Sequence, residues 1–159
     1  MGHAIKHYQK LYGIEDSFLA RFKERNAETA EKGFRPFKGA AEICRAVKEC
    51  GGENYLLTHR GESSAYFIAK FGLASCFAEL VTSKNAFERK PSPQGILHLI
   101  KQHDFPMREA LMIGDRDIDI LAAKSAGINS CFFSHEGGHC PQATMNVSSF
   151  EELLSALNE

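Results

Sequence analysis

From about residue 55 to the C-terminus, short apolar runs alternate with longer segments whose apolar residues recur at helical spacing. The apolar runs cover residues 55–57, 80–81, 110–113 and 130–133, and the helix-patterned segments cover 38–50, 63–71, 91–103, 117–126 and 150–157. Strands that are apolar at nearly every position are typical of sheets covered on both faces, and intervening helices favour parallel pairing. The pattern therefore predicts an α/β fold with a doubly wound parallel sheet whose strands are buried on both faces.

The first third of the chain has a different character, because it is helical in pattern and contains no apolar run. Residues 4–12 and 17–32 are rich in Glu, Lys, Arg and Ala, which are frequent in helices. Gly33 and Pro36 interrupt the pattern, as expected near the end of a helix. We therefore expect two helices before the α/β part begins.

Charge, hydropathy and cysteine usage exclude several classes of protein. The 19 basic and 20 acidic side chains give a net charge of −1, which argues against a dedicated nucleic-acid binder but not against a small phosphorylated ligand. No apolar run approaches the roughly 20 residues of a membrane span, and the polar N-terminus has no signal-peptide core. The five cysteines are odd in number and dispersed, so we expect free thiols in a reducing compartment. These features predict a cytoplasmic protein that binds neither nucleic acid nor membrane.

Polar residues follow the first two predicted strands, at the edge where parallel α/β sheets bind ligands. Thr58 and His59 come directly after the first strand, and a hydroxyl beside free backbone N–H groups suits a phosphate oxygen. A helix N-cap or a turn is the alternative role for Thr58. Lys90 precedes Pro91, where we expect a helix to begin. A cation at a helix N-terminus opposes the helix dipole, so Lys90 is either functional or a solvated side chain.

The segment Gly114-Asp115-Arg116-Asp117-Ile118-Asp119 is the most specific local signal in the chain. Three carboxylates within five residues follow a buried strand, and their repulsion is costly unless a cation neutralises it. Mg²⁺ accepts such oxygen ligands and completes its shell with water and substrate phosphate. Acid placement at a helix N-terminus is the alternative, and it explains Asp117 better than it explains Asp115.

Taken in order, Thr58, Lys90-Pro91 and Gly114-Asp115-x3-Asp119 resemble the haloacid dehalogenase (HAD) superfamily. The similarity is to its phosphatase branch with a helical cap, the phosphoglycolate-phosphatase-like group. The resemblance implies that Thr58 binds the transferring phosphoryl group and that Lys90 neutralises its charge. It further implies that Asp115 binds Mg²⁺ with Asp119 as a supporting carboxylate. His59, beside Thr58, is a further candidate phosphate ligand, and the implied substrate is the phosphate monoester of a small metabolite.

The chain departs from that family in one respect, because the family's nucleophile is the first Asp of an Asp-x-Asp-x-Thr motif after its first strand. No such motif and no apolar strand precede residue 39, and the two Asp-x-Asp strings both belong to the segment 115–119. The resemblance thus implies a C-terminal part of the helical cap over 1–35 and a core lacking its first strand over 36–159. The sheet is then expected to have an internal gap or a rearranged order.

Several functions remain open on the sequence alone. The first is a HAD-like Mg²⁺-dependent phosphohydrolase whose chain is truncated and alone inactive. The second is a non-catalytic or regulatory protein that binds phosphate or Mg²⁺. A third is self-association through the incomplete sheet, with another chain supplying the strand. An unrelated receiver or flavodoxin-like domain is the alternative fold, although it does not explain the order of Thr58, Lys90 and Asp115.

Overall fold

The computed structural model describes residues 9–18, 20–21, 24–25, 33, 35–61 and 63–157. The chain divides into two compact units, residues 1–36 and 37–159. In the first unit, residues 9–12, 16–18, 20–21 and 24–25 are helical. The remainder of the two helices predicted over 4–12 and 17–32 lies outside the described residues.

The second unit alternates helices and strands, and every strand pairing in it is parallel. The helices are α3 (Ala40–Glu49), α4 (Ser63–Lys70), α5 (Gln94–His103), α6 (Asp117–Ala126) and α7 (Phe150–Leu157). The strands are β1 (Asn54–Leu57), β2 (Phe77–Val81), β3 (Leu111–Gly114), β4 (Asn129–Phe133) and β5 (Met145–Val147). The predicted α/β class with parallel pairing is thereby confirmed.

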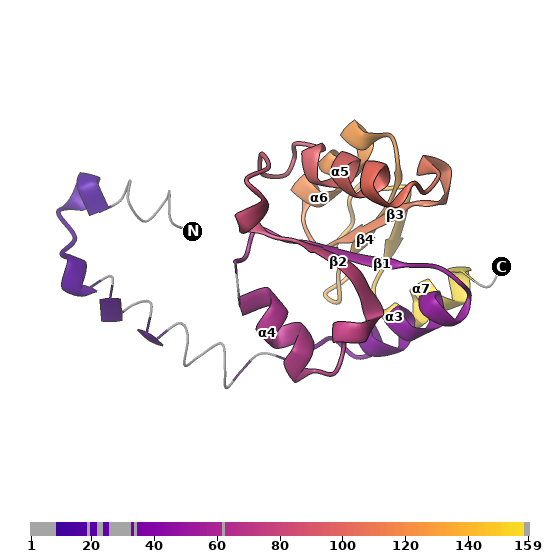
Figure 1. Ribbon diagram of the computed structural model, residues 1–159, viewed down its shortest axis with the longest axis horizontal. Helices are drawn as coiled ribbons and strands as arrows, with labels where there is room; N and C mark the ends of the chain where they lie inside the picture. The colour runs from indigo at the N-terminus through magenta and orange to yellow at the C-terminus, as the bar shows by residue number, and fades with distance from the viewer. Residues whose placement is uncertain are drawn as a thin grey trace. The chain divides into compact units, whose positions relative to one another are not determined.

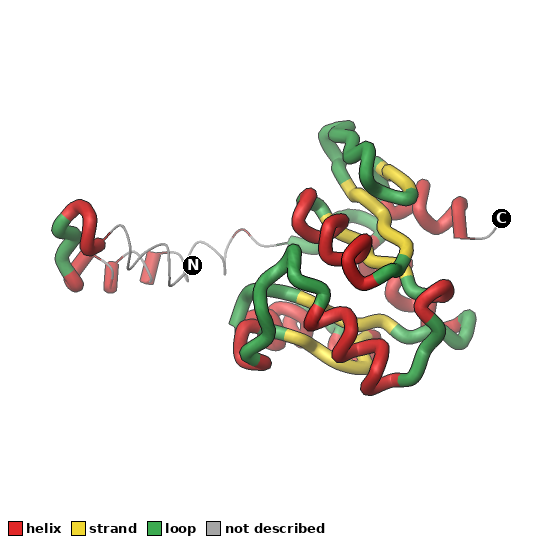
Figure 2. Tube along the Cα trace, turned by 90° about the horizontal axis from the view of Figure 1, so that it is seen from above, coloured by secondary structure: helices red, strands yellow, loops and turns green. Residues whose placement is uncertain are grey.

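The strands form two sheets, with the order β1-β2 in one and β3-β4-β5 in the other. Helices α5 and α6 pack against each other on one side of the strands, and α3 and α7 lie on the other side (Figure 1). Figure 2 shows the two groups of strands from above. Among the described residues, no strand of one sheet is hydrogen-bonded to a strand of the other. β1 and β3 therefore each pair with a single neighbour.

β4, the strand with two neighbours, is more buried than β1 and β3, which have one each. β4, which pairs on both sides, buries Ser130, Cys131 and Phe133. All four residues of β1 are only half-buried, and the side chain of Ile113 in β3 is 38% exposed. The prediction that the strands are buried on both faces is therefore wrong for β1 and β3, because a strand that lacks one neighbour leaves its side chains partly open to water.

The larger hydrophobic core lies where α3 and α7 pack near β4 and β5. Its buried members are Ile43, Cys131, Phe133, Val147 and Leu153. Burial raises the pKa of the Cys131 thiol to about 11, so this sulfur stays protonated and acts as a packing group. All five cysteines are free, as expected. In the part of the chain that the structure describes, no helix is long and apolar enough to span a membrane.

Helix α5 begins three residues later than the sequence pattern predicts. We expected it to start at Pro91, but its N-cap is Pro93 and its first residue is Gln94. Ser92 precedes Pro93, and a residue before proline is disfavoured in the helical region, which explains the delay. Lys90 therefore lies in a turn rather than at a helix N-terminus, and the expected conflict with the helix dipole is absent.

A carboxylate bridged by two histidines joins α5 to β2. The two carboxylate oxygens of Glu79 each accept a hydrogen bond of 2.8 Å, one from His98 Nε2 and one from His103 Nε2. Burial opposes ionisation of this carboxyl, but the hydrogen bonds from His103 and His98 outweigh it and hold the pKa of Glu79 below its usual value. The ionised form is thus stabilised by folding.

We expect Glu79→Gln to lower the free energy of unfolding near neutral pH by roughly 1–2 kcal/mol, because both imidazoles lose a charged acceptor and one of them faces an amide NH₂ group instead. A carboxyl whose pKa is lowered by folding contributes stability above its unfolded pKa and loses it as pH falls through the folded pKa. The difference in unfolding free energy between wild type and variant should therefore shrink once the pH drops below 4.5, the usual pKa of a glutamate carboxyl. Urea unfolding at several pH values measures this, with exposed Glu49→Gln as control. A difference that grows on acidification would contradict the assignment.

Candidate functional site

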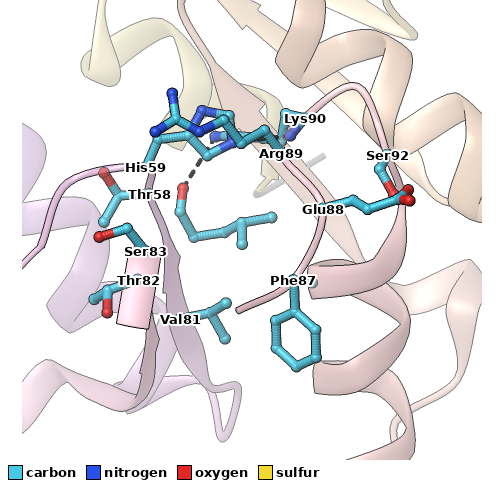
Figure 3. A pocket seen from close by; sticks show the side chains of 12 residues that line it. Thr58, His59, Val81, Thr82, Ser83, Phe87, Glu88, Arg89, Lys90 and Ser92 are labelled. Carbon is cyan, nitrogen blue, oxygen red and sulfur yellow. Dashed lines mark hydrogen bonds between the residues drawn. The ribbon is translucent and has the colours of Figure 1, made fainter. Parts of the chain in front are cut away.

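A pocket lies at the carboxyl ends of β1 and β2. It is lined by residues 57–59, 81–83, 87–90, 92 and 95. Thr58 and His59 lie on one side of it, Phe87 and Glu88 lie on the other, and Lys90 lies at one end between them (Figure 3). Three of the five sequence-predicted site residues, Thr58, His59 and Lys90, are thus brought to one cavity from positions up to 32 residues apart.

Thr58 is held in place by main-chain hydrogen bonds at the end of β1. Its N–H donates to the carbonyl oxygen of Val81 at 2.9 Å, which continues the pairing with β2. Its hydroxyl oxygen accepts a hydrogen bond from the Arg60 N–H at 3.1 Å, so it also forms the turn that the alternative interpretation favoured. A hydroxyl that accepts one bond retains a hydrogen to donate, which leaves it suited to an anion.

Lys90 connects the end of β1 with the start of α6. Its Nζ donates to the carbonyl oxygen of Leu57 at 3.0 Å and lies 2.6 Å from Oδ1 of Asp119. Both charged side chains are almost completely buried, with exposed fractions of 6% for Lys90 and 3% for Asp119. Lys90 is therefore a component of a buried ion pair, and the interpretation as a solvated side chain is wrong.

Asp119 is confined by the backbone around it. Its Oδ2 accepts a hydrogen bond from the Arg116 N–H at 3.2 Å, which fixes the carboxylate at the first turn of α6. A Cβ added at Gly114 would lie 2.3 Å from Cβ of Asp119, so only glycine fits at the end of β3. Oδ1 forms the ion pair with Lys90 Nζ, and no described residue donates an aligned hydrogen bond to it.

Asp115 has a contrasting environment, because its side chain is 72% exposed. Nε of Arg116 lies 3.9 Å from Oδ1 of Asp115 and 3.7 Å from Oδ2 of Asp119, between the two carboxylates. Neither Asp115 nor Asp119 lines the pocket, although Lys90 joins the pocket to Asp119. The metal residues are therefore adjacent to the phosphate residues rather than inside the same cavity.

The two carboxylates fit a Mg²⁺ site that takes most of its ligands from solvent and substrate. Across the described residues, no group of three or more His, Cys, Asp or Glu side chains is arranged to hold a metal ion. Asp115 is open to water, and Oδ1 of Asp119 has no aligned hydrogen bond beside its ion pair with Lys90. Mg²⁺ is commonly bound through one or two carboxylates with several waters retained. The oxygen donors suit Mg²⁺ rather than a softer metal.

His59 makes a contact that the sequence did not indicate. Its Nε2 accepts a hydrogen bond of 2.8 Å from the main-chain N–H of Lys90. Burial lowers the pKa of His59, and the nearby cations of Lys90, Arg89 and Arg116 lower it further, against an opposing effect of the Asp119 carboxylate. The ring is therefore neutral near pH 7.

Two features of the site lay outside the sequence analysis. The Leu57 carbonyl is a partner of Lys90, and no side-chain pattern can point to a backbone oxygen. The Arg116 side chain lies near the carboxylates of both Asp115 and Asp119. Its place in the sequence, between Asp115 and Asp117, could have indicated that it contacts acidic neighbours.

The fold and the residue order are both similar to those of known proteins. Residues 1–133 match the family model described as haloacid dehalogenase-like hydrolase. The phosphoglycolate phosphatase of Vibrio vulnificus is 27% identical over 119 residues, which are 74% of this chain and 52% of that protein. The pyrophosphatase PpaX of Halalkalibacterium halodurans is 24% identical over 116 residues, 72% of this chain and 54% of that protein. The chain thus spans about half the length of the curated relatives it matches.

Solved structures agree with this assignment of the fold. The crystal structure of YfnB from Bacillus subtilis, bound to magnesium, aligns with a TM-score of 0.78. It is 23% identical, and the alignment covers 94% of this chain and 67% of that chain. The α/β architecture of residues 37–159 is thereby shared with an established fold.

Proposed function

The chain belongs to the haloacid dehalogenase-like hydrolase family, and we propose that its pocket binds the phosphoryl group of a small phosphorylated metabolite beside a Mg²⁺ site. One observation carries the proposal. Nζ of Lys90 contacts both the end of β1, at the Leu57 carbonyl, and the Asp119 carboxylate. Lys90 thereby joins the end of β1, in one sheet, to Asp119, which follows β3 of the other sheet.

Each side chain has a role that its environment supports. Thr58 is fixed by its main-chain N–H, which donates to Val81, and by its hydroxyl oxygen, which accepts from Arg60. Its hydroxyl hydrogen is available to donate to a phosphoryl oxygen. The Lys90 ammonium is buried and has a fixed position, so it compensates the phosphoryl charge without reorganising. Asp115 and Asp119 are the residues that would hold Mg²⁺, and the ion would supply further neutralisation of the phosphate charge there.

The attacking carboxylate of the resembling family is not among these 159 residues. The 159 residues contain no Asp-x-Asp-x-Thr motif, so aspartyl-phosphate chemistry lacks its carboxylate in this chain. We therefore keep binding without turnover, in a regulatory role, as the second candidate function. Thr58, Lys90 and the two aspartates serve binding as well as they serve catalysis.

The architecture we propose for the chain follows from the same reasoning. Residues 1–35 are the C-terminal part of a helical cap, and 36–159 are a HAD-like core that lacks one strand between β1 and β3. The separation into two sheets and the exposure of Ile113 support a gap at that place. Strand edges left open there are also where self-association is expected. For the substrate, the names of the relatives favour a small phosphate ester or a pyrophosphate.

Two measurements on the 159-residue chain test the proposal. We expect Mg²⁺ binding by isothermal titration calorimetry, and we expect Asp115→Asn to weaken it by roughly 10–100-fold. Asp117→Asn, which removes the same charge from an exposed neighbour, should change the affinity much less. Equal effects of the two variants would contradict the assignment of Asp115.

We expect hydrolysis of an aryl phosphate to remain at the buffer background with and without Mg²⁺. Robust Mg²⁺-dependent turnover that Asp115→Asn abolishes would show that the argument from the absent nucleophile is wrong. Mg²⁺ binding without turnover agrees with the proposal.

A further inference from the structure

Lys90 is held at both its main chain and its side chain by the same short segment. The carbonyl oxygen of Leu57 accepts from Lys90 Nζ at 3.0 Å, and Nε2 of His59 accepts from Lys90 N at 2.8 Å. Thr58 lies between these two residues in the chain, and it lines the same pocket as Lys90 (Figure 3). Beside the ion pair with Asp119, two hydrogen bonds thus hold Lys90 close to Thr58, and the His59 side chain supplies one of them.

The His59 hydrogen bond defines the state of the imidazole ring. The main-chain N–H of Lys90 can only donate, so Nε2 must carry no proton and the proton of a neutral ring must be on Nδ1. A doubly protonated ring has no acceptor and leaves the half-buried N–H of Lys90 without its partner. The contact therefore exists only while His59 is neutral.

We propose that His59 is a positioning residue that holds Lys90, in its neutral Nδ1–H form, so that the Lys90 ammonium and the Thr58 hydroxyl meet one bound tetrahedral anion. This inference rests on the proposed phosphate site, and it gives His59 a role different from that of a direct phosphate ligand. Acidification then weakens anion binding, because a protonated His59 releases the Lys90 main chain.

The charges around the ring agree with this role. The cations of Lys90, Arg89 and Arg116 act to lower the pKa of the imidazole, and the Asp119 carboxylate acts in the opposite direction. Protonation would add another positive charge to this group of cations and would remove a hydrogen bond at the same time. Both effects keep the ring neutral at the pH where the site is assembled.

The first test concerns the ring alone and needs no ligand. In ¹⁵N NMR spectra of the labelled 159-residue chain near pH 7, we expect Nε2 of His59 to resonate as an unprotonated ring nitrogen and Nδ1 as a protonated one. A protonated Nε2 would overturn the proposal whether or not the pocket binds phosphate.

The second test measures binding of inorganic sulfate, a tetrahedral dianion whose own charge does not change between about pH 5 and 8. We expect wild type to bind sulfate roughly three- to tenfold more weakly at the acid end, as the loss of one hydrogen bond implies. His59→Gln places an amide oxygen near Nε2 and cannot titrate, so its affinity should be close to that of wild type at high pH and nearly constant. His59→Ala should bind weakly throughout.

The outcomes separate the two proposals. If sulfate binds more tightly to wild type at low pH and His59→Gln abolishes this gain, His59 is itself an anion ligand and the positioning role is wrong. If no form of the chain binds sulfate while the NMR spectra show unprotonated Nε2, the phosphate site fails and the Lys90 contact stands. Thermal unfolding of each variant verifies that it folds, and His59→Gln retains the test should His59→Ala not fold.

Discussion

Replacing Lys90 with methionine is expected to lower the free energy of unfolding by about 3–5 kcal/mol, because it leaves the Asp119 carboxylate buried without its countercharge. The carboxylate is 3% exposed and lies 2.6 Å from Lys90 Nζ. Methionine has nearly the length of the aliphatic part of lysine, so the loss of unfolding free energy results mainly from removal of the charge. Urea unfolding followed by circular dichroism measures the effect.

Two further variants separate the charge from the packing. Lys124→Met removes an exposed lysine from the last turn of α6 and should cost no more than about 1 kcal/mol. Adding Asp119→Asn to Lys90→Met removes the unpaired charge and should recover a large part of the loss, since the amide keeps the shape of the carboxylate. If Lys90→Met costs no more than Lys124→Met, the buried ion pair is not present in solution.

Gly114→Ala is expected to destabilise the protein by about 1–3 kcal/mol and to weaken Mg²⁺ binding as well. The added methyl group would lie 2.3 Å from Cβ and 2.8 Å from Cγ of Asp119, which is far inside van der Waals contact. Asp119 is buried and cannot swing into solvent, so either β3 or α6 must shift. Such a shift moves Asp119 away from Lys90, and it changes the site together with the stability.

Gly61→Ala is the matched control, because it adds the same methyl group to a glycine near the pocket. The nearest atom to its Cβ would be Oγ of Ser83 at 3.5 Å, an ordinary contact. The unfolding free energy and the Mg²⁺ affinity are measured for both variants and for wild type. Both quantities should be lower than in wild type for Gly114→Ala and close to wild type for Gly61→Ala. A Gly114→Ala variant as stable as wild type would mean that β3 and α6 are less closely packed than described.

Much of the fold is predictable because local signals coincide with it. Gly127 ends α6 in a left-handed conformation, and the helix spans the range expected from its apolar spacing. β5, residues 145–147, was not predicted, because a three-residue strand has no period to detect. The half-burial of β1 and β3 was also missed, since it depends on which strands become neighbours and not on the residues within them.

The site is predictable to the extent that strand ends determine it. Thr58, Lys90, Asp115 and Asp119 were expected to converge on one pocket, because ligand sites lie beyond the carboxyl ends of parallel strands. Thr58 and Lys90 line the pocket, and Lys90 contacts Asp119, but neither aspartate lines it. The bond between His59 and Lys90 spans 31 residues and involves a main-chain donor. Sequence patterns report side-chain types and not main-chain geometry, so no sequence pattern could predict this hydrogen bond.

The division of the strands into two sheets determines where partial unfolding of the native state can begin. Coupling between the sheets depends on the packing of α5 against α6, on the contacts of α3 with β1 and α7, and on the contact of Lys90 with Asp119. Partial unfolding can therefore begin as a separation of the two sheets, each of which stays intact. The backbone amide hydrogens within each sheet are then still protected from exchange. By thermodynamic linkage, any ion that binds across that junction makes such openings rarer.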